Sequence, residues 1–182
     1  EIMKYLDSFG KPIFMVAGNW DQSYGNSGVK DMNNNDYNYL KWFYDSYGGD
    51  KINPVLTRGL KNIRNCMLHN CEFGGINFIG YGLSSAPEDL GMRIKRREKR
   101  HKRKIGRFSD RQIGMLRRAH DKIVDKLERV YLSRKNGRLP TFFISHNIPN
   151  NTKLDKITDK ESYAYGKHLG STIARRFCMK FK

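Results

Sequence analysis

Short apolar runs that break off into glycine and polar residues are the clearest pattern along the chain. Residues 13–21 read IFMVAGNWD, in which five uncharged apolar residues lead to Gly18. Residues 141–144 form a second apolar run, and Ser145-His146-Asn147 follows it directly. Short apolar runs of this kind predict strands that are buried on both faces of a sheet. Each predicted strand therefore delivers polar side chains to its carboxyl end.

Apolar positions at helical spacing predict the helices that cover this sheet. Residues 1–9 predict the last turns of a helix that packs on the sheet and ends at Gly10, and residues 54–63 predict a short helix that begins with a proline. A capping box at Ser109 and Gln112 opens a long helix, and its stripe consists of Ile113, Leu116, His120, Ile123, Leu127 and Val130. A last helix opens at Gly170-Ser171, and its apolar positions are Ile173, Ala174 and Phe177.

A hairpin is predicted between these helices, with residues 66–71 and 76–81 as its strands and Gly74-Gly75 as its turn. Aromatic residues crowd into 37–47, where they either pack a loop onto the core or stack on a nucleobase or aryl group of a substrate. Strands and helices mixed in this way predict an α/β fold. The 182 residues suffice for a single domain with a hydrophobic core.

Positive charge is concentrated in one segment, which we interpret as a basic insertion at about 91–108. The formal net charge is +17, and residues 93–107 hold ten Lys or Arg against one Glu, so more than half of the excess is local. Such a block is either a solvated arm or a set of contacts to nucleic-acid phosphates. The candidate nucleic-acid-binding residues are Arg93, Lys95, Arg96, Arg97, Lys99, Arg100, Lys102, Arg103 and Lys104.

Cysteine usage and hydropathy indicate the compartment. Cys66, Cys71 and Cys178 have neither an even count nor the spacing of a zinc ribbon, which favours structural cysteines in a reduced cytoplasm. The sequence contains no apolar run long enough to cross a bilayer. We therefore expect a cytoplasmic protein without a transmembrane segment.

Three polar residues at the two strand ends have the chemistry of metal ligands. Asn19 and Asp21 offer oxygen atoms, and His146 offers an imidazole. Ligands of open α/β sheets bind beyond the carboxyl ends of the strands, so these three are the candidate catalytic residues. A lone histidine after a strand is also common as a structural residue, and the pattern alone leaves both interpretations open.

The two strand ends resemble motifs of the calcineurin-like metallophosphoesterase family. Gly18-Asn19-Trp20-Asp21 resembles the family's Gly-Asn-His-Asp/Glu motif, and residues 144–149 (ISHNIP) resemble its strand that ends in a metal-binding His followed by Pro. Residues 78–82, 152–155 and 166–171 are similar to further segments of the family. The order and spacing agree from residue 2 to about residue 177.

The resemblance implies a layered β-sandwich flanked by helices and the activity of a metal-dependent phosphohydrolase, either a phosphomonoesterase or a phosphodiesterase. It implies two divalent metal ions that activate a water, with Asn19 and His146 binding one of them and Asp21 orienting the loop. Mixed nitrogen and oxygen ligands suit Mn, Fe or Zn better than Mg. A phosphoester substrate is the expected partner.

The chain departs from the family pattern in two ways. The family's Asp-x-His and Gly-Asp motifs should precede residue 1 and its Gly-His-x-His motif should follow residue 182, so we expect a domain truncated at both ends. Trp20 stands where the family usually has a His that helps to protonate the leaving group. We therefore expect weak metal binding and little turnover from this chain alone. The alternatives are a nucleic-acid-binding module and an inactive phosphoesterase scaffold.

The start of the predicted last helix is a candidate phosphate site. Exposed backbone N–H groups and the helix dipole at such a position favour an anion. His168 precedes this start, Ser171 opens the helix and Arg175 lies one turn in. These three residues are the candidate phosphate-binding residues.

Overall fold

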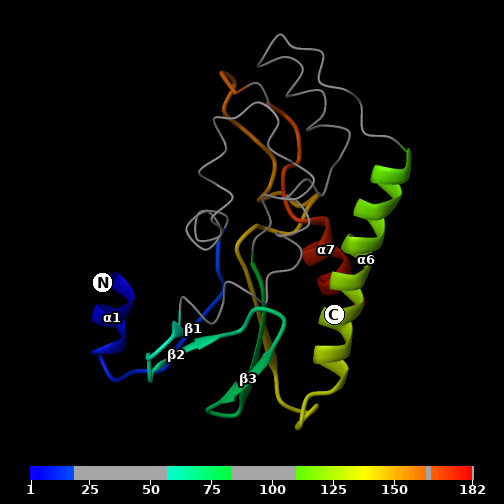
Figure 1. Cartoon of the computed structure of the whole chain (residues 1–182). Helices are drawn as coiled ribbons and strands as arrows, with labels where there is room; N and C mark the ends of the chain where they lie inside the picture. Colours follow the sequence, from blue (N-terminus) through cyan, green and yellow to red (C-terminus); the bar gives the residue numbers. More distant parts are fainter. Residues whose placement is uncertain (19–56, 83–109, 163–164, 182) are drawn as a thin grey trace.

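The computed structural model describes residues 1–18, 57–82, 110–162 and 165–181, and these form a mixed α/β structure (Figure 1). Asn19, Asp21, the aromatic group at 37–47 and the basic segment 93–107 lie outside the described residues. The elements in chain order are α1 (Ile2–Asp7), β1 (Ile13–Met15), β2 (Ile63–Asn65), β3 (Asn70–Phe73), β4 (Ile76–Tyr81), α6 (Asp110–Leu132), β5 (Thr141–Ser145) and α7 (Thr172–Lys180). The predicted α/β class is confirmed.

The described strands form two small sheets. β1 and β2 pair in parallel, whereas β4 pairs antiparallel with β3 and parallel with β5. Just beyond β2, the Cys66 carbonyl accepts a 2.8 Å hydrogen bond from the Gly80 amide of β4, and Met67 forms a parallel bridge to Gly80. The chain after β2 therefore lies beside β4, and β1, β4 and β5 all run in the same direction.

One face of β4 and β5 is covered by α6 and α7, and the core lies in this layer (Figure 1). Alternate residues of a strand point to the same face, and Ile79 and Tyr81 of β4 are fully buried there. Phe143 of β5 stacks on Phe177 of α7 at a centroid distance of 4.6 Å. From α6 the buried core residues include Ile123, Val124 and Leu127, and from α7 they include Ile173 and Phe177.

α6 and α7 agree with their sequence pattern where their side chains are described; Ser109 and the side chains of Ile113 and Leu116 lie outside that part. Within α6, the predicted stripe is buried at Ile123 and Leu127, and His120 lies at its edge, where Nε2 is 3.0 Å from the Thr172 hydroxyl. α7 begins at Thr172, and its N-cap Ser171 accepts a 2.9 Å hydrogen bond from the Ala174 amide. Such a cap satisfies one of the backbone N–H groups that every helix start leaves without a helical partner.

The prediction that residues 1–9 pack a helix on the sheet is half right. A helix is present, but none of its residues is buried, and Ile2 is 76% exposed. Figure 1 shows α1 standing apart from α6 and α7. Its end is tied by polar contacts instead, because the Asp7 carboxylate accepts hydrogen bonds from the amides of Lys61 and Asn62 at 2.6–3.1 Å.

Three predicted boundaries are wrong. The first strand is regular only over Ile13–Met15, and its residues are half-buried instead of covered on both faces. The predicted helix 54–63 does not extend to its last residue, because Ile63 pairs with Ile13 in β2. The hairpin begins at Asn70 instead of residue 66, because Leu68 adopts φ 55° and turns the chain between the bridge to Gly80 and β3.

Candidate functional site

The carboxyl ends of β1 and β5 meet at Gly18 and His146. A Cβ atom placed on Gly18 would lie 2.9 Å from Cε1, 3.0 Å from Nδ1 and 3.4 Å from Nε2 of His146. The imidazole edge that carries both nitrogen atoms therefore faces the end of β1. Asn19 is the next residue after Gly18 and lies outside the described residues, so its ligation of a metal together with His146 stays a prediction.

Two other contacts bring the end of β4 close to His146 and to the end of β1. The His146 amide donates a 3.2 Å hydrogen bond to the Tyr81 carbonyl at the end of β4. Gly82 follows, and a side chain there would overlap the Ala17 carbonyl, so only glycine lets the ends of β4 and β1 approach so closely. The carboxyl ends of β1, β4 and β5 therefore converge beside His146.

A short turn after β5 carries His146. The Ser145 hydroxyl donates a 2.5 Å hydrogen bond to the Asn147 carbonyl and so bridges the residues on either side of the histidine. Further along, the Ser171 amide donates to the Ile148 carbonyl at 2.7 Å, and the Asn150 amide donates to the Ser171 carbonyl at 2.9 Å. The segment that follows His146 is thus bonded directly to the start of α7.

Among the residues of the described ranges, no three His, Cys, Asp or Glu side chains are grouped closely enough to hold a metal ion. His146 is the one predicted ligand within those ranges, and its nitrogen-bearing edge faces the strand that leads to Asn19. Asn19 lies outside the described residues, so metal binding by the pair stays a prediction.

The candidate phosphate residues all have structural partners. The Ser171 side chain is fully buried and caps α7. The Arg175 guanidinium donates from Nη1 to the carbonyls of Asn150 and Asn151 at 2.8 and 2.9 Å. His168 Nδ1 lies 2.7 Å from Asp155 Oδ1. The Arg175 bonds hold Asn150 and Asn151 against α7, and phosphate binding by this corner stays a prediction.

Asp155 organises this loop, and the sequence did not single it out. Its buried carboxylate accepts hydrogen bonds from the amides of Asn151, Thr152 and Gly170 at 2.9, 2.7 and 3.0 Å, in addition to the His168 contact. Burial alone would raise the pKa of this carboxyl, but the hydrogen bonds from His168 and from the backbone outweigh burial and hold the pKa well below its usual range. Asp155 is therefore a permanent anion at neutral pH.

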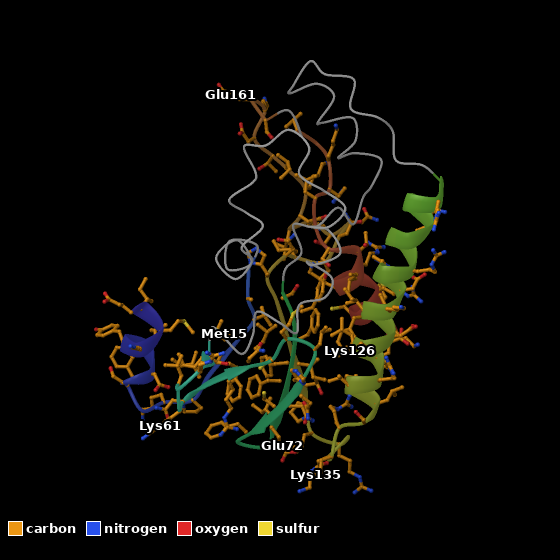
Figure 2. All side chains as sticks on the ribbon, in the orientation of Figure 1. Met15, Lys61, Glu72, Lys126, Lys135 and Glu161 are labelled. Carbon is orange, nitrogen blue, oxygen red and sulfur yellow. The ribbon has the colours of Figure 1, made fainter. Side chains whose placement is uncertain are left out.

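Figure 2 shows the two ends of the described structure. Glu72 of the hairpin and Lys135 beyond α6 lie at one end, and Glu161 in the loop after β5 lies at the other. β5 runs from the first end toward the second, so His146 and the Asp155 loop follow its carboxyl end.

Comparison of the chain with family profiles, with curated proteins and with solved structures found no match. None of the described helices combines the length and apolar character that a bilayer crossing requires.

Proposed function

We propose that this chain is the core of a metal-dependent phosphohydrolase of the calcineurin-like type, with a layered β-sandwich fold, in which Asn19 and His146 bind the metal. The observation that carries this proposal is the contact between Gly18 and the nitrogen-bearing edge of His146. That contact brings the residue before Asn19 to the imidazole, as ligation of one metal by both side chains requires. The converging strand ends match the usual place of ligands in open α/β sheets.

The chemistry of such a site is phosphoester hydrolysis. Bound divalent cations would lower the pKa of a coordinated water and offset the charge of the phosphoryl group. His146 would act as a neutral ligand, and the turn closed by Ser145 and Asn147 would fix the direction of its ring. Asn19 would bind the same metal and contact the phosphate, and Asp21 would orient the loop between them. The phosphate corner at His168, Ser171 and Arg175 would serve the same substrate.

Binding of Mn²⁺ to the 182-residue chain tests the ligand assignment. Paramagnetic Mn²⁺ broadens the NMR signals of nearby nuclei, so substoichiometric additions should first broaden the Gly18 amide and the His146 ring. His146→Ala should weaken Mn²⁺ binding by roughly tenfold or more. His69→Ala is the matched control, because His69 is exposed and outside the strands, and it should leave binding unchanged. Equal affinity in both variants would overturn the assignment.

Hydrolysis of an aryl phosphodiester with Mn²⁺ tests the reaction. We expect slow turnover that is abolished by His146→Ala and retained by His69→Ala. Turnover that persists without His146 would exclude this site as its source. Metal binding through His146 with no hydrolysis at all would instead identify an inactive phosphoesterase scaffold.

Nucleic-acid binding is the second candidate function, and one structural observation favours it. α6 exposes Arg111, Arg117 and Arg118 in the turns that immediately follow the basic segment 93–107. A helix that continues the positive charge extends the set of groups able to contact phosphates. The basic segment would then hold a nucleic acid, either alone or as the substrate of the phosphohydrolase.

Filter binding to random oligonucleotides at several salt concentrations tests this second function. Each lost phosphate contact should reduce the slope of log affinity against log salt by roughly 0.9 on duplex DNA. Replacing the nine candidate Lys and Arg residues of 93–104 by Gln should therefore flatten the slope. Gln substitution of the exposed Lys153, Lys156 and Lys160 is the control and should have little effect. An unchanged slope after neutralising the segment would rule it out.

A further inference from the structure

Two of the three cysteines lie side by side at the edge of β4. Cys66 is fully buried, and its carbonyl is bonded to the Gly80 amide, whereas Cys71 is half-buried and pairs with Phe78. Phe78 and Gly80 are two residues apart on one strand, so both cysteines adjoin the same edge. The turn at Leu68, with φ 55°, folds the short segment between them back on itself.

Their sulfur atoms approach the backbone carbonyls of two adjacent residues, Arg64 and Asn65. The Cys71 thiol donates to the Asn65 carbonyl at 3.6 Å, and Asn65 immediately precedes Cys66. The Cys66 thiol lies 3.9 Å from the Arg64 carbonyl. The two thiols also shift each other's pKa in opposite directions. Cys178 lies instead on α7, on the helical side of the sheet.

The two sulfurs differ in reactivity. The hydrogen bond from Cys66 stabilises the Cys71 thiolate, and with the positive charge of Arg64 it lowers the pKa of Cys71 to about 7 despite burial. The same contact, together with burial, raises the pKa of the Cys66 thiol. Because the thiolate is the nucleophile, Cys71 is the attacking sulfur and Cys66 is the resolving one.

We propose that Cys66 and Cys71 are a peroxide-sensitive modification site that closes reversibly into an intramolecular disulfide. The Cys71 thiolate attacks one oxygen of hydrogen peroxide, an S–O bond forms as the O–O bond breaks, and hydroxide leaves. The Cys66 sulfur then attacks the Cys71 sulfenic acid, losing its proton as the second oxygen leaves as water. The two sulfurs together lose two electrons to the peroxide. A dithiol reductant reverses the step.

Mass spectrometry of the oxidised chain tests the proposal without altering either cysteine. In the Cys178→Ala background, trypsin releases residues 65–93 as one peptide that contains both sulfurs. After one equivalent of hydrogen peroxide, we expect this peptide to lose the mass of two hydrogen atoms and to resist alkylation until a dithiol is added. An unchanged peptide, or a disulfide that links two chains, would overturn the proposal.

Two further variants in that background test the assigned roles. Cys66→Ser leaves Cys71 without a resolving thiol, so dimedone should trap a sulfenic acid there. Cys71→Ser should give little label, because Cys66 is buried. Circular dichroism spectra that match the parent would show that both variants are folded. Dimedone labelling of Cys66 in the folded Cys71→Ser variant would reverse the assigned roles and overturn the mechanism. None of these results depends on metal binding or hydrolysis.

Discussion

His146 packs its imidazole edge against Gly18, so closely that a β-carbon at residue 18 would lie 2.9 Å from Cε1. No L-residue with a side chain fits there unless the ring moves. Gly18 therefore has a packing role that is separate from any backbone flexibility. This contact holds the end of β1 against the His146 side chain that follows β5.

Gly18→Ala should displace His146 and destabilise the fold. Adding a methyl group to a filled space costs about 1–3 kcal/mol in the free energy of unfolding, and the moved imidazole should also weaken Mn²⁺ binding. Gly137→Ala is the matched control, because a β-carbon there meets no atom within 4 Å. Urea denaturation and Mn²⁺ titration of both variants measure the two effects. Equal values for both variants would contradict the close contact.

Asp155→Asn should destabilise the loop that links β5 to α7. The substitution keeps one oxygen acceptor but turns an amide N–H toward backbone donors, so some of the bonds from Asn151, Thr152 and Gly170 must be lost. Leaving a buried donor without a partner costs about 1–3 kcal/mol. Asp159→Asn is the control, because Asp159 is exposed and its carboxylate accepts a local bond from the Glu161 amide two residues away. Urea denaturation at pH 7 should separate the two variants.

Asp155 should also make stability depend on pH in the acidic range. Its folded-state pKa is below the ordinary value of 3.8, so the unfolded chain takes up a proton at a higher pH than the folded chain. The stabilisation is therefore complete above the ordinary value and is lost as the pH falls below about 4 toward the lower folded pKa. Unfolding free energies between pH 6 and pH 2.5 should fall less steeply in Asp155→Asn than in the parent. Parallel curves would show that Asp155 contributes nothing to the acid sensitivity.

The sequence predicted correctly those structural elements that are determined by residues close together in the chain. The Ser171 cap, the spacing of Ile173 and Phe177, and the glycine turn between β3 and β4 each act within a few residues. The run 141–144 was predicted as a strand for the same reason, and β5 extends it by one residue to Ser145. The polar residues after each apolar run marked the strand ends, whereas the contact between Gly18 and His146 became apparent only in the structure.

The features that the sequence missed depend on distant partners. Asp155 gains its role from the amide of Gly170 and the ring of His168, which only the folded loop brings to its carboxylate. β2 is a three-residue strand with an exposed Arg64 at its centre, so it lacks an apolar run and becomes a strand by pairing with β1. The proximity of Cys71 to Cys66 likewise depends on the turn at Leu68.

The reactivity of Cys71 should follow pH with a midpoint set by Cys66. In the Cys178→Ala background, alkylation by iodoacetamide should reach half of its maximal rate near pH 7, because the pKa of Cys71 is lowered to about 7. Cys66→Ala removes the hydrogen bond to the thiolate and should move the midpoint toward the ordinary pKa of 9.0. Cys66→Ser keeps a donor at the same place and should hold the midpoint low. A midpoint that is the same in all three proteins would show that Cys66 does not activate Cys71, and Arg64 would then be the remaining candidate to test by substitution with Gln.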